Sequence, residues 1–517
     1  NERKFLFRGT KNSKENPPEV NSCLQFLQAR GNFLTKSQRR RRQNDVFVTC
    51  KVRGSSPCEP VGLVHSPSPG SLSCTTMEIS ELDRKFNIID GDTPINEHLS
   101  AHYKRSFAHY TVKDRLPVIL TRIIDSLSRE KEAIIAGYGE EAADDLKDVI
   151  GNISKLKYEL QTDKKFKLLD GNDTDQEEWN AFLEALPDTH NSYFSAVWLH
   201  AECYMYRRVR SMFEETTTLR EFDYFRRQKK DAFMGSLEAF QQLTEKFNEK
   251  RMVKTRDELR GLFRQLMRVN LWGNRIDLSI SGGKIVSQCG DPFEALGNLE
   301  EYILADDTAA VWDCIATTDG NIIVDFVCDN AGYELFTDLC LADFLISHNL
   351  AAKVRFHVKM IPWFVSDVTP EDFRWTLDAL KLSVTATLRD LGCRLSNYIE
   401  TGHFELIEGE HFWTSPRDFC EMESVKPSVH RMLQQAHLVI FKGDLNYRKL
   451  LGDIKWDPTV PFVEAIRTFR PTNLCSLRTV KADLVAGLPP ERAEELTAKD
   501  PKWMESGEYG VIQFAPK

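Results

Sequence analysis

The spacing of apolar residues changes once along the chain, near residue 310, and this change constrains the fold more than any other feature. From about 106 to 280, apolar residues recur at the three- and four-residue intervals of a buried helix face. After about 310, short β-branched or aromatic runs alternate with helical stretches. Such alternation predicts an α/β protein, with an N-terminal helical domain followed by an α/β/α domain built on a largely parallel sheet. The helical pattern is seen at Leu116, Ile119, Leu120, Ile123, Ile124 and Leu127, and the strand runs are 322–328, 354–358, 437–441 and 474–477.

Residues 1–76 differ in composition from the rest of the chain. They contain the run Arg39–Arg42, a Ser/Pro-rich stretch from Ser66 to Ser73, and no sustained hydrophobic period. We therefore predict a disordered extension or translated leader over 1–76, with Met77 as the biological start. A mainly helical domain is predicted over 77–310 and the α/β/α domain over 311–517. The alternative for Arg39–Arg42 is a nuclear-localisation or nucleic-acid patch.

The charge of the chain is divided unevenly. Residues 1–76 carry 13 Lys/Arg and 5 Asp/Glu, whereas the remainder carries 55 and 72, a net charge of −17. A body this acidic repels phosphate backbones, so no nucleic-acid partner is expected. No apolar stretch approaches the roughly 20 residues of a membrane span, so no membrane partner is expected. Twelve cysteines without a CxxC spacing indicate reduced thiols, which predicts a cytoplasmic protein, with the nucleus as a second location.

Polar side chains follow each of the four predicted strands. In open parallel sheets ligands bind at the carboxyl ends of the strands, where the loops converge. Two of these loops supply oxygen ligands and two supply cations, a combination that suits a divalent metal together with a phosphate. The loops carry Asp329-Asn330, Asp367, the segment Asp444-Leu445-Asn446-Tyr447-Arg448, and Arg478 with Lys481.

Each of these residues also has a simpler interpretation. Asp329-Asn330 precedes a predicted helix, and an Asp-Asn pair in that position is often only an N-cap. Asp367 could cap the next helix in the same way, and Arg478 and Lys481 could end a solvated strand. The strand-end interpretation gains weight because all four loops are predicted at one edge of the sheet.

The ordered set of motifs resembles a known family. Asp329-Asn330-Ala331-Gly332, Trp363-Phe364-Val365-Ser366-Asp367, Gly443-Asp444-Leu445-Asn446-Tyr447-Arg448-Lys449 and Arg478-Thr479-Val480-Lys481 resemble the damage-control phosphatases, once known as domain of unknown function 89. The final tetrad resembles subfamily III. From about Tyr110 to Gln513 the chain is also similar to animal members of that family, including the segments 198–208 and 271–274.

The resemblance implies a helical domain joined to an α/β/α domain that binds metal and phosphate. It implies Mn²⁺, Mg²⁺, Ni²⁺ or Co²⁺ held by Asp329, Asn330 and Asp367, which would be the catalytic residues. It further implies hydrolysis of sugar phosphates such as fructose 1-phosphate and fructose 6-phosphate. Substrate contacts are expected from Asp329, Asn330, Glu334, Asp444, Leu445, Asn446, Tyr447, Arg448 and Lys481, with Arg478, Glu202, Arg207 and Asn274 as further site residues.

Two other functions remain open at this point. Animal members similar to this chain have been assigned S-adenosylmethionine-dependent methyl-esterification of protein glutamates, which would make proteins the substrates. The sequence lends this little support, because its nearest glycine pair, Gly282-Gly283, is explained by a linker turn. The third function is an interaction protein whose helical half is the working surface. Glu202 and Arg207 could equally form an ion pair on a helix surface.

Overall fold

The computed structural model describes residues 81–171, 173–253, 255–282 and 296–517, except the side chains of 81–82, 274–282 and 296–298. Residues 80–517 form one compact unit. The predicted extension over 1–76 lies outside the described residues, and the predicted boundary at 310 stays a prediction. Over the part of the chain described, every helix is too short or too polar to cross a membrane.

The second half of the unit is organised around a seven-stranded sheet of order β1-β7-β6-β5-β2-β3-β4. Strands β6, β5, β2, β3 and β4 pair with one another in parallel. Strand β7 runs antiparallel to β6, and β1 pairs in parallel with β7. The four predicted strands are confirmed as β2, β3, β5 and β6. The strands are β1 (Ile303–Asp306), β2 (Ile323–Val327), β3 (Lys353–His357), β4 (Phe404–Ile407), β5 (Leu438–Lys442), β6 (Asn473–Thr479) and β7 (Gly510–Ala515).

Helices account for most of the remaining chain, and the predicted helical half is confirmed. The first group is α2 (Glu81–Lys85), α3 (Phe107–Tyr110), the π-helical η1 (Thr111–Arg115), α4 (Leu116–Tyr138), α5 (Ala142–Gln161), α6 (Gln176–Ala185), η2 (Asp188–His190) and α7 (Trp198–Glu214). The second is α8 (Arg226–Gly235), α9 (Leu237–Lys250), α10 (Arg256–Gly282), η4 (Leu296–Tyr302), α12 (Thr308–Ala316), α13 (Tyr333–Ser347), α14 (Pro370–Lys381) and α15 (Ala386–Glu400). The last is η5 (His411–Thr414), η6 (Phe419–Glu421), α16 (Met422–Val425), α17 (Pro427–Leu433), α18 (Gly443–Leu451), α19 (Phe462–Ala465) and α20 (Arg492–Lys499).

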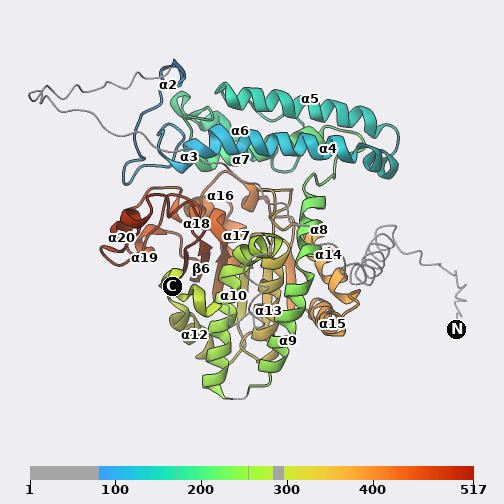
Figure 1. The fold of residues 1–517 in the computed structure, drawn as a ribbon, viewed down its shortest axis with the longest axis vertical. Coiled ribbons are helices and arrows are strands. Elements are labelled where there is room, and N and C mark those ends of the chain that lie inside the picture. Colours follow the sequence, from blue (N-terminus) through green and yellow to red (C-terminus); the bar gives the residue numbers. More distant parts are fainter. Residues whose placement is uncertain (1–80, 172, 254, 283–295) are drawn as a thin grey trace, which may run out of the picture. The chain divides into compact units, whose positions relative to one another are not determined.

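The two faces of the sheet bury different helices. Helices α8–α10 and α12–α15 share one apolar core with Phe326 and Ile440, and Figure 1 shows α10 and α13 side by side. Helices α3–α7 and α16–α20 share the other core with Val327 and Phe441. Because α8–α10 pack with the sheet helices, helices from the first half of the chain contribute to the α/β layers. Alternate residues of one strand thus face opposite cores, as the two-residue period of a strand requires.

A buried ion pair lies inside the sheet. Asp325 interrupts the apolar run of β2, and its partner Arg355 stands directly opposite on β3. Arg355 Nε and Nη2 donate to the two carboxylate oxygens at 2.6 and 2.8 Å. His357 Nε2 lies 3.2 Å from the same carboxylate. Removing one partner of such a pair would leave an uncompensated buried charge, so the pair ties β2 to β3.

Gly392 in α15 tests the close packing of α15 against α14, and Gly151 in α5 is its control. A Cβ at Gly392 in α15 would lie 2.5 Å from the backbone nitrogen of Lys381 and 2.7 Å from the carbonyl carbon of Leu380. Gly392→Ala is therefore expected to lower Tm by several degrees. Gly151→Ala, in α5, meets nothing within 4 Å and is expected to raise stability by about 0.5–1 kcal/mol through helix propensity. Thermal unfolding of both variants measures this, and an equal response in the two would contradict it.

Candidate active site

The order of the strands reverses between β2 and β5, and the loops after these two strands meet. The chain proceeds from β2 outward to β3 and β4, then returns to the other side of β2 with β5 and β6. Ligands bind at such switch points in open α/β sheets. Gly443, directly after β5, has φ +81°, and a Cβ there would lie 2.0 Å from Oδ2 of Asp329, which follows β2. Only glycine leaves room for this carboxylate.

Asp329 and Asn330 belong to a buried polar cluster between β2 and α13. Asn330 Nδ2 donates to Asp329 Oδ2 at 2.7 Å and to Glu334 Oε2 at 2.8 Å. Glu334 also accepts from Lys442 Nζ at 2.9 Å. The N-cap of α13 is Gly332, without a side-chain cap. Helix capping therefore does not explain the Asp-Asn pair.

Asp367 is presented by a strained loop after β3. The preceding residues Phe364 and Val365 have φ of 41° and 72°, conformations that side-chain-bearing residues rarely adopt. Ser366 Oγ donates to Asn330 Oδ1, and Asn330 and Asp367 form an isolated β-bridge. The N-cap of α14 is Thr369, which forms a capping box with Asp372. Capping is thus performed by a different residue, and Asp367 is left to face the site.

Aromatic residues from the helical part hold this loop. The rings of Tyr206 on α7 and Phe364 stack with centroids 4.7 Å apart. Tyr224 donates its hydroxyl to the carbonyl of Pro362 at 3.4 Å. Such contacts offset the cost of the positive φ angles, which is of order 1–3 kcal/mol per residue.

The carboxylates of the site are crowded and poorly compensated. Burial raises the pKa of Asp329 well above its ordinary value, and the neighbouring Glu334 and Asp367 raise it further. Burial also raises the pKa of Asp367, although Lys359 partly opposes the shift. Asp367 Oδ2 is buried and accepts no hydrogen bond from the described residues, and Lys359 Nζ lies 3.6 Å away.

The loops after β5 and β6 are joined by a carboxylate. Asp444 Oδ1 accepts from Arg478 Nε at 2.7 Å and from the backbone N–H of Lys481 at 3.1 Å. Arg478 is fully buried, and its other guanidinium nitrogens donate to the carbonyls of Leu484 and Ala482. Arg478 is therefore buried and not solvated at the end of its strand, and its bond to Asp444 positions that carboxylate.

Arg448 connects α18 to the helical part. Its Nη1 donates to Glu202 Oε2 on α7 at 2.7 Å, and its Nε donates to Asp453 Oδ1 at 2.7 Å. The guanidinium carbon lies 3.5 Å from the ring centroid of Trp198, also on α7. All these side chains are at least nine-tenths buried. The predicted site residues Glu202 and Arg448 thus form a buried ion pair, which fixes one wall of the site.

A cavity of about 240 Å³ unites most of the predicted site residues with side chains from the helical half. Its lining combines the strand-end loops with α7 and the end of η1. It is lined by Arg115, Trp198, Glu202, Asp329, Asn330, Phe364, Ser366, Asp367, Asp444, Leu445, Arg448, Thr479 and Lys481.

Other predicted residues lie outside the lining of this cavity. Asn446 Nδ2 donates to the carbonyl of Lys442 at 2.7 Å, and Tyr447 donates to Gln513 Oε1 at 2.9 Å. Both side chains are buried and are bonded within the core. The predicted placement of Arg207 at the site, or in a surface pair, needs correction, since it is buried and bonded to Asp175 and Glu214. Glu334 sits behind Asn330, and the side chain of Asn274 lies outside the described residues.

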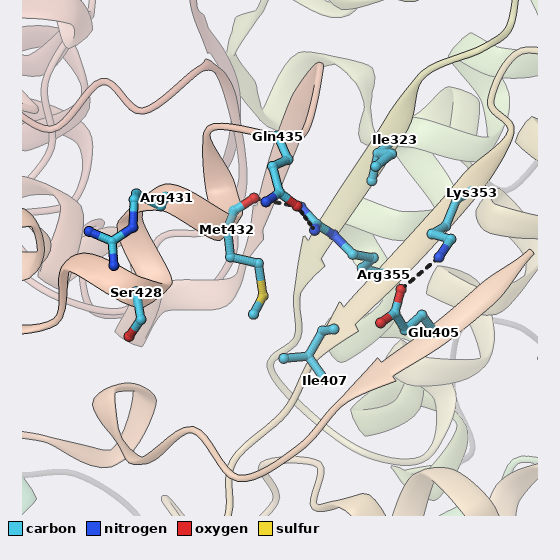
Figure 2. A pocket seen from close by; sticks show the side chains of 9 residues that line it. All are labelled: Ile323, Lys353, Arg355, Glu405, Ile407, Ser428, Arg431, Met432 and Gln435. Atoms are coloured by element: carbon cyan, nitrogen blue, oxygen red, sulfur yellow. Dashed lines mark hydrogen bonds and ion pairs between the residues drawn. The ribbon is translucent and has the colours of Figure 1, made fainter. Parts of the chain in front are cut away.

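A larger hollow of about 450 Å³ lies elsewhere, on the face of β2, β3 and β4 (Figure 2). Two of its lining residues, Ile323 and Lys353, begin their strands, so it lies toward the amino ends. Two of its cations already have partners within the lining: Lys353 pairs with Glu405 at 2.9 Å, and Arg355 donates to Gln435 at 3.1 Å. We assign the active site to the smaller cavity, because the strand-end carboxylates and cations converge there.

Two charged residues at the site were not predicted from the sequence. Lys359, beside Asp367, follows β3 by only two positions, and the strand-end rule would have found it. Arg115 belongs to the helical half, where nothing in its sequence context distinguishes it from other exposed arginines. It reaches the cavity only through the packing of the helices.

The donor set of the predicted metal site fits a hard divalent cation. Two buried carboxylates with raised pKa values and one amide oxygen match the oxygen ligands that Mg²⁺ and Mn²⁺ prefer. The buried Asp367 Oδ2, which lacks a hydrogen-bond donor among the described residues, is a position that a cation would satisfy. In the described ranges, no three His, Cys, Asp or Glu side chains gather as a metal site by themselves. The set therefore depends on the oxygen of Asn330.

Sequence comparison identifies the family. The pattern described as "Damage-control phosphatase ARMT1-like domain" matches residues 111–496, which include both the helical wall and the strand-end loops. The chain belongs to the damage-control phosphatase family. Relatives named "Damage-control phosphatase ARMT1" include the protein of Danio rerio, 42% identical over 434 residues that cover 81% of this chain and 97% of the relative. The Mus musculus protein is 41% identical over 429 residues (80% and 98%), and the Homo sapiens protein 40% over 431 (80% and 98%).

Among solved structures, a DUF89 family protein from Pyrococcus horikoshii is similar over 75% of this chain and 94% of its own length, at 16% identity and a TM-score of 0.40. The family membership confirms the resemblance seen in the motifs and the expectation of a phosphatase. The individual roles of the site residues stay predictions.

Gly443 provides a sharp test of the switch-point geometry. Gly443→Ala forces a side chain into the position of the Asp329 carboxylate, and a displacement of about 1 Å there is expected to lower kcat roughly a hundredfold. Gly409→Ala is the matched control, since Gly409 has the same φ of +81° and nothing within 4 Å of its Cβ. Both variants carry the same backbone strain, about 1–2 kcal/mol. Equal activity in the two would contradict the assignment.

Proposed function

We propose that this chain is a metal-dependent phosphatase that hydrolyses small sugar phosphates, such as fructose 1-phosphate and fructose 6-phosphate. The observation that carries the proposal is the convergence of carboxylates and cations from four strand ends on one cavity, in a chain of the damage-control phosphatase family. The substrate class follows from the family resemblance. It is supported by a cavity of about 240 Å³, which suits a small metabolite better than a protein chain.

In this proposal Asp329, Asn330 and Asp367 hold one divalent cation, with Mn²⁺, Mg²⁺, Ni²⁺ and Co²⁺ as the candidates. When bound, the cation supplies Lewis-acid stabilisation of the phosphoryl group. The residues behind the ligands have positioning roles. Ser366 orients the amide of Asn330 through a hydrogen bond to Oδ1, and Lys359 limits the negative charge at Asp367.

In this proposal the chain itself also binds the phosphate. Helices α13 and α18 both begin at the site, at Gly332 and Gly443, so their N-terminal amides favour an anion there. Lys481 lines the same cavity and supplies a full positive charge to the phosphoryl oxygens. A Cβ added at Gly507 would lie 3.1 Å from the Cε of this lysine, so the lysine stem passes close to the glycine. Asp444, fixed by Arg478, is placed to accept a hydrogen bond from a substrate hydroxyl.

The S-adenosylmethionine-dependent methyl transfer to protein glutamates stays a prediction, and no contact in the cavity favours it over phosphate hydrolysis. The cytoplasmic or nuclear location also stays a prediction. The seven cysteines that the structure describes are free thiols, which suits a reducing compartment.

Removing either metal carboxylate should abolish phosphate release while sparing the fold. Asp329→Ala and Asp367→Ala are expected to leave Tm unchanged or raised without metal, because each removes a buried carboxylate whose charged form is disfavoured by burial. Phosphate release from a panel of sugar phosphates, with Mn²⁺ and with chelator, measures activity. Mn²⁺ should raise the Tm of the wild type by mass action and leave both variants unaffected.

Glu405→Ala is the matched control, since it removes an exposed carboxylate from the larger hollow at a cost of about 0–1 kcal/mol. It should retain full activity. Full activity in Asp329→Ala at saturating metal, or inactivity in Glu405→Ala, would refute the choice of cavity.

Lys481 separates phosphatase from methyltransferase chemistry. Lys481→Ala is expected to lower phosphatase kcat/KM roughly a hundredfold, the scale for loss of one preorganised charge. Lys481→Arg should recover part of the loss, because charge is kept while geometry changes. Steady-state phosphate release checks both variants. Unchanged phosphatase activity together with lost methyl transfer would favour the second activity.

A further inference from the structure

One wall of the cavity comes from the helical part, and its outermost residue is Arg115. This residue ends the five-residue π-helical segment Thr111–Arg115, which separates α3 from α4. A π-helical turn contains about one residue more than an α-helical turn, so the side chains after it point in different directions from those of a continuous α-helix. Such segments are rare and are often found at functional sites. The turn here sets Arg115 on the cavity that Asp329 and Lys481 also line.

The guanidinium of Arg115 stacks on an aromatic ring. Its central carbon lies 5.3 Å from the ring centroid of Phe107, which occupies a face of the guanidinium and leaves its N–H edges in the plane. The side chain is exposed, and within the described residues it takes part in no ion pair.

The two buried arginines beside the cavity differ from Arg115 in this respect. Arg448 is held by Glu202 and Asp453. Arg478 is held by Asp444 and two carbonyls. The charges of both guanidiniums are already compensated by buried carboxylates, whereas Arg115 has no ion-pair partner among the described residues, which suits it to bind an anionic ligand.

The two cations Lys481 and Arg115 lie on different sides of the cavity. The guanidinium of Arg115 stacks on Phe107, and the ring of Phe107 packs edge-on against Trp198 on α7, with the ring centroids 5.7 Å apart. The backbone N–H of Lys481 donates to Asp444, which follows β5. Lys481 therefore lies on the strand-end side of the cavity and Arg115 on the α7 side. A ligand that spans the cavity meets a cation at each end.

We propose that Arg115 is a specificity-determining residue that binds a second anionic group of the substrate, a carboxylate or a second phosphate, remote from the phosphate held near Asp329 and Lys481. The inference rests on the proposed phosphatase function and extends it: among small phosphorylated metabolites, the site favours those that carry a second negative charge. A planar guanidinium with open N–H edges matches a carboxylate or phosphate in two parallel hydrogen bonds. The acidic body of the chain gives such a cation the further task of attracting anions to the cavity.

The test compares glucose 6-phosphate with 6-phosphogluconate, an open-chain phosphate that carries a carboxylate at C1, with the full chain and Mn²⁺; the Arg115 variants separate the effect of the carboxylate from that of the open chain. Arg115→Ala should lower kcat/KM for 6-phosphogluconate about tenfold, on the scale of one exposed charge-assisted hydrogen bond. The loss should fall on KM, because the group binds away from the reacting atoms. The value for glucose 6-phosphate should stay within about twofold. Arg115→Lys should recover part of the loss, and added salt should reduce the difference.

Lys113→Ala is the matched control, since Lys113 is an exposed cation on the same π-helical segment but does not line the cavity. It should leave both substrates unaffected. Equal losses for the two substrates in Arg115→Ala, or no loss for either, would overturn the proposal.

Measuring the Kd of each substrate distinguishes a failure of the anion-site proposal from a failure of the proposed phosphatase function. If the wild type releases phosphate from neither substrate, the phosphatase proposal fails for both. A tighter Kd for 6-phosphogluconate than for glucose 6-phosphate, lost in Arg115→Ala, would still support the anion site. The absence of any such difference in Kd would overturn it.

Discussion

The guanidinium of Arg448 is the interaction on which the site depends most. It binds Glu202 on α7 and Asp453 beyond α18, and it lies over the ring of Trp198. Asp453 also accepts from the N-terminal backbone of α7, at Leu199. One buried cation thus joins the helical part to the helix that follows β5. Because its charge is desolvated, loss of either carboxylate would leave it uncompensated, so the two parts of the cavity wall are held in one arrangement.

A second constraint is the crowding of buried acids around Asn330. Beyond the effect of burial, Glu334 and Asp367 raise the pKa of Asp329 and Glu334 raises that of Asp367, whereas Lys442 helps to lower the pKa of Glu334. A cluster of this kind is costly in a protein that needs only to fold. In the proposed function, a divalent cation and an anionic substrate would compensate this cost by binding together. The arrangement therefore exchanges stability for binding capacity.

Much of this could be predicted from the sequence, because parallel strands bring their carboxyl ends to one edge. The rule found Asp329, Asp367, Asp444 and Lys481 without any knowledge of packing. The rule could not tell which residues of 444–448 line the cavity and which are buried in the core. This segment belongs to α18, and only part of a helix surface can face a cavity. Strands β1, β4 and β7 were not predicted; β1 and β4 have only four residues each, which gives little pattern to detect. Arg115 escaped because its place depends on how distant helices pack.

The loop through Phe364 and Val365 has a consequence for how this site arises. Two adjacent side-chain-bearing residues at positive φ form a conformation that an isolated peptide would rarely populate. The stacking of Tyr206 on Phe364 comes from a helix more than 150 positions earlier in the sequence. The conformation of the loop that presents Asp367 thus depends on both halves of the chain. A sheet fragment excised from this protein, or the same motif grafted onto another α/β scaffold, would keep the sequence of this loop and still lack its conformation.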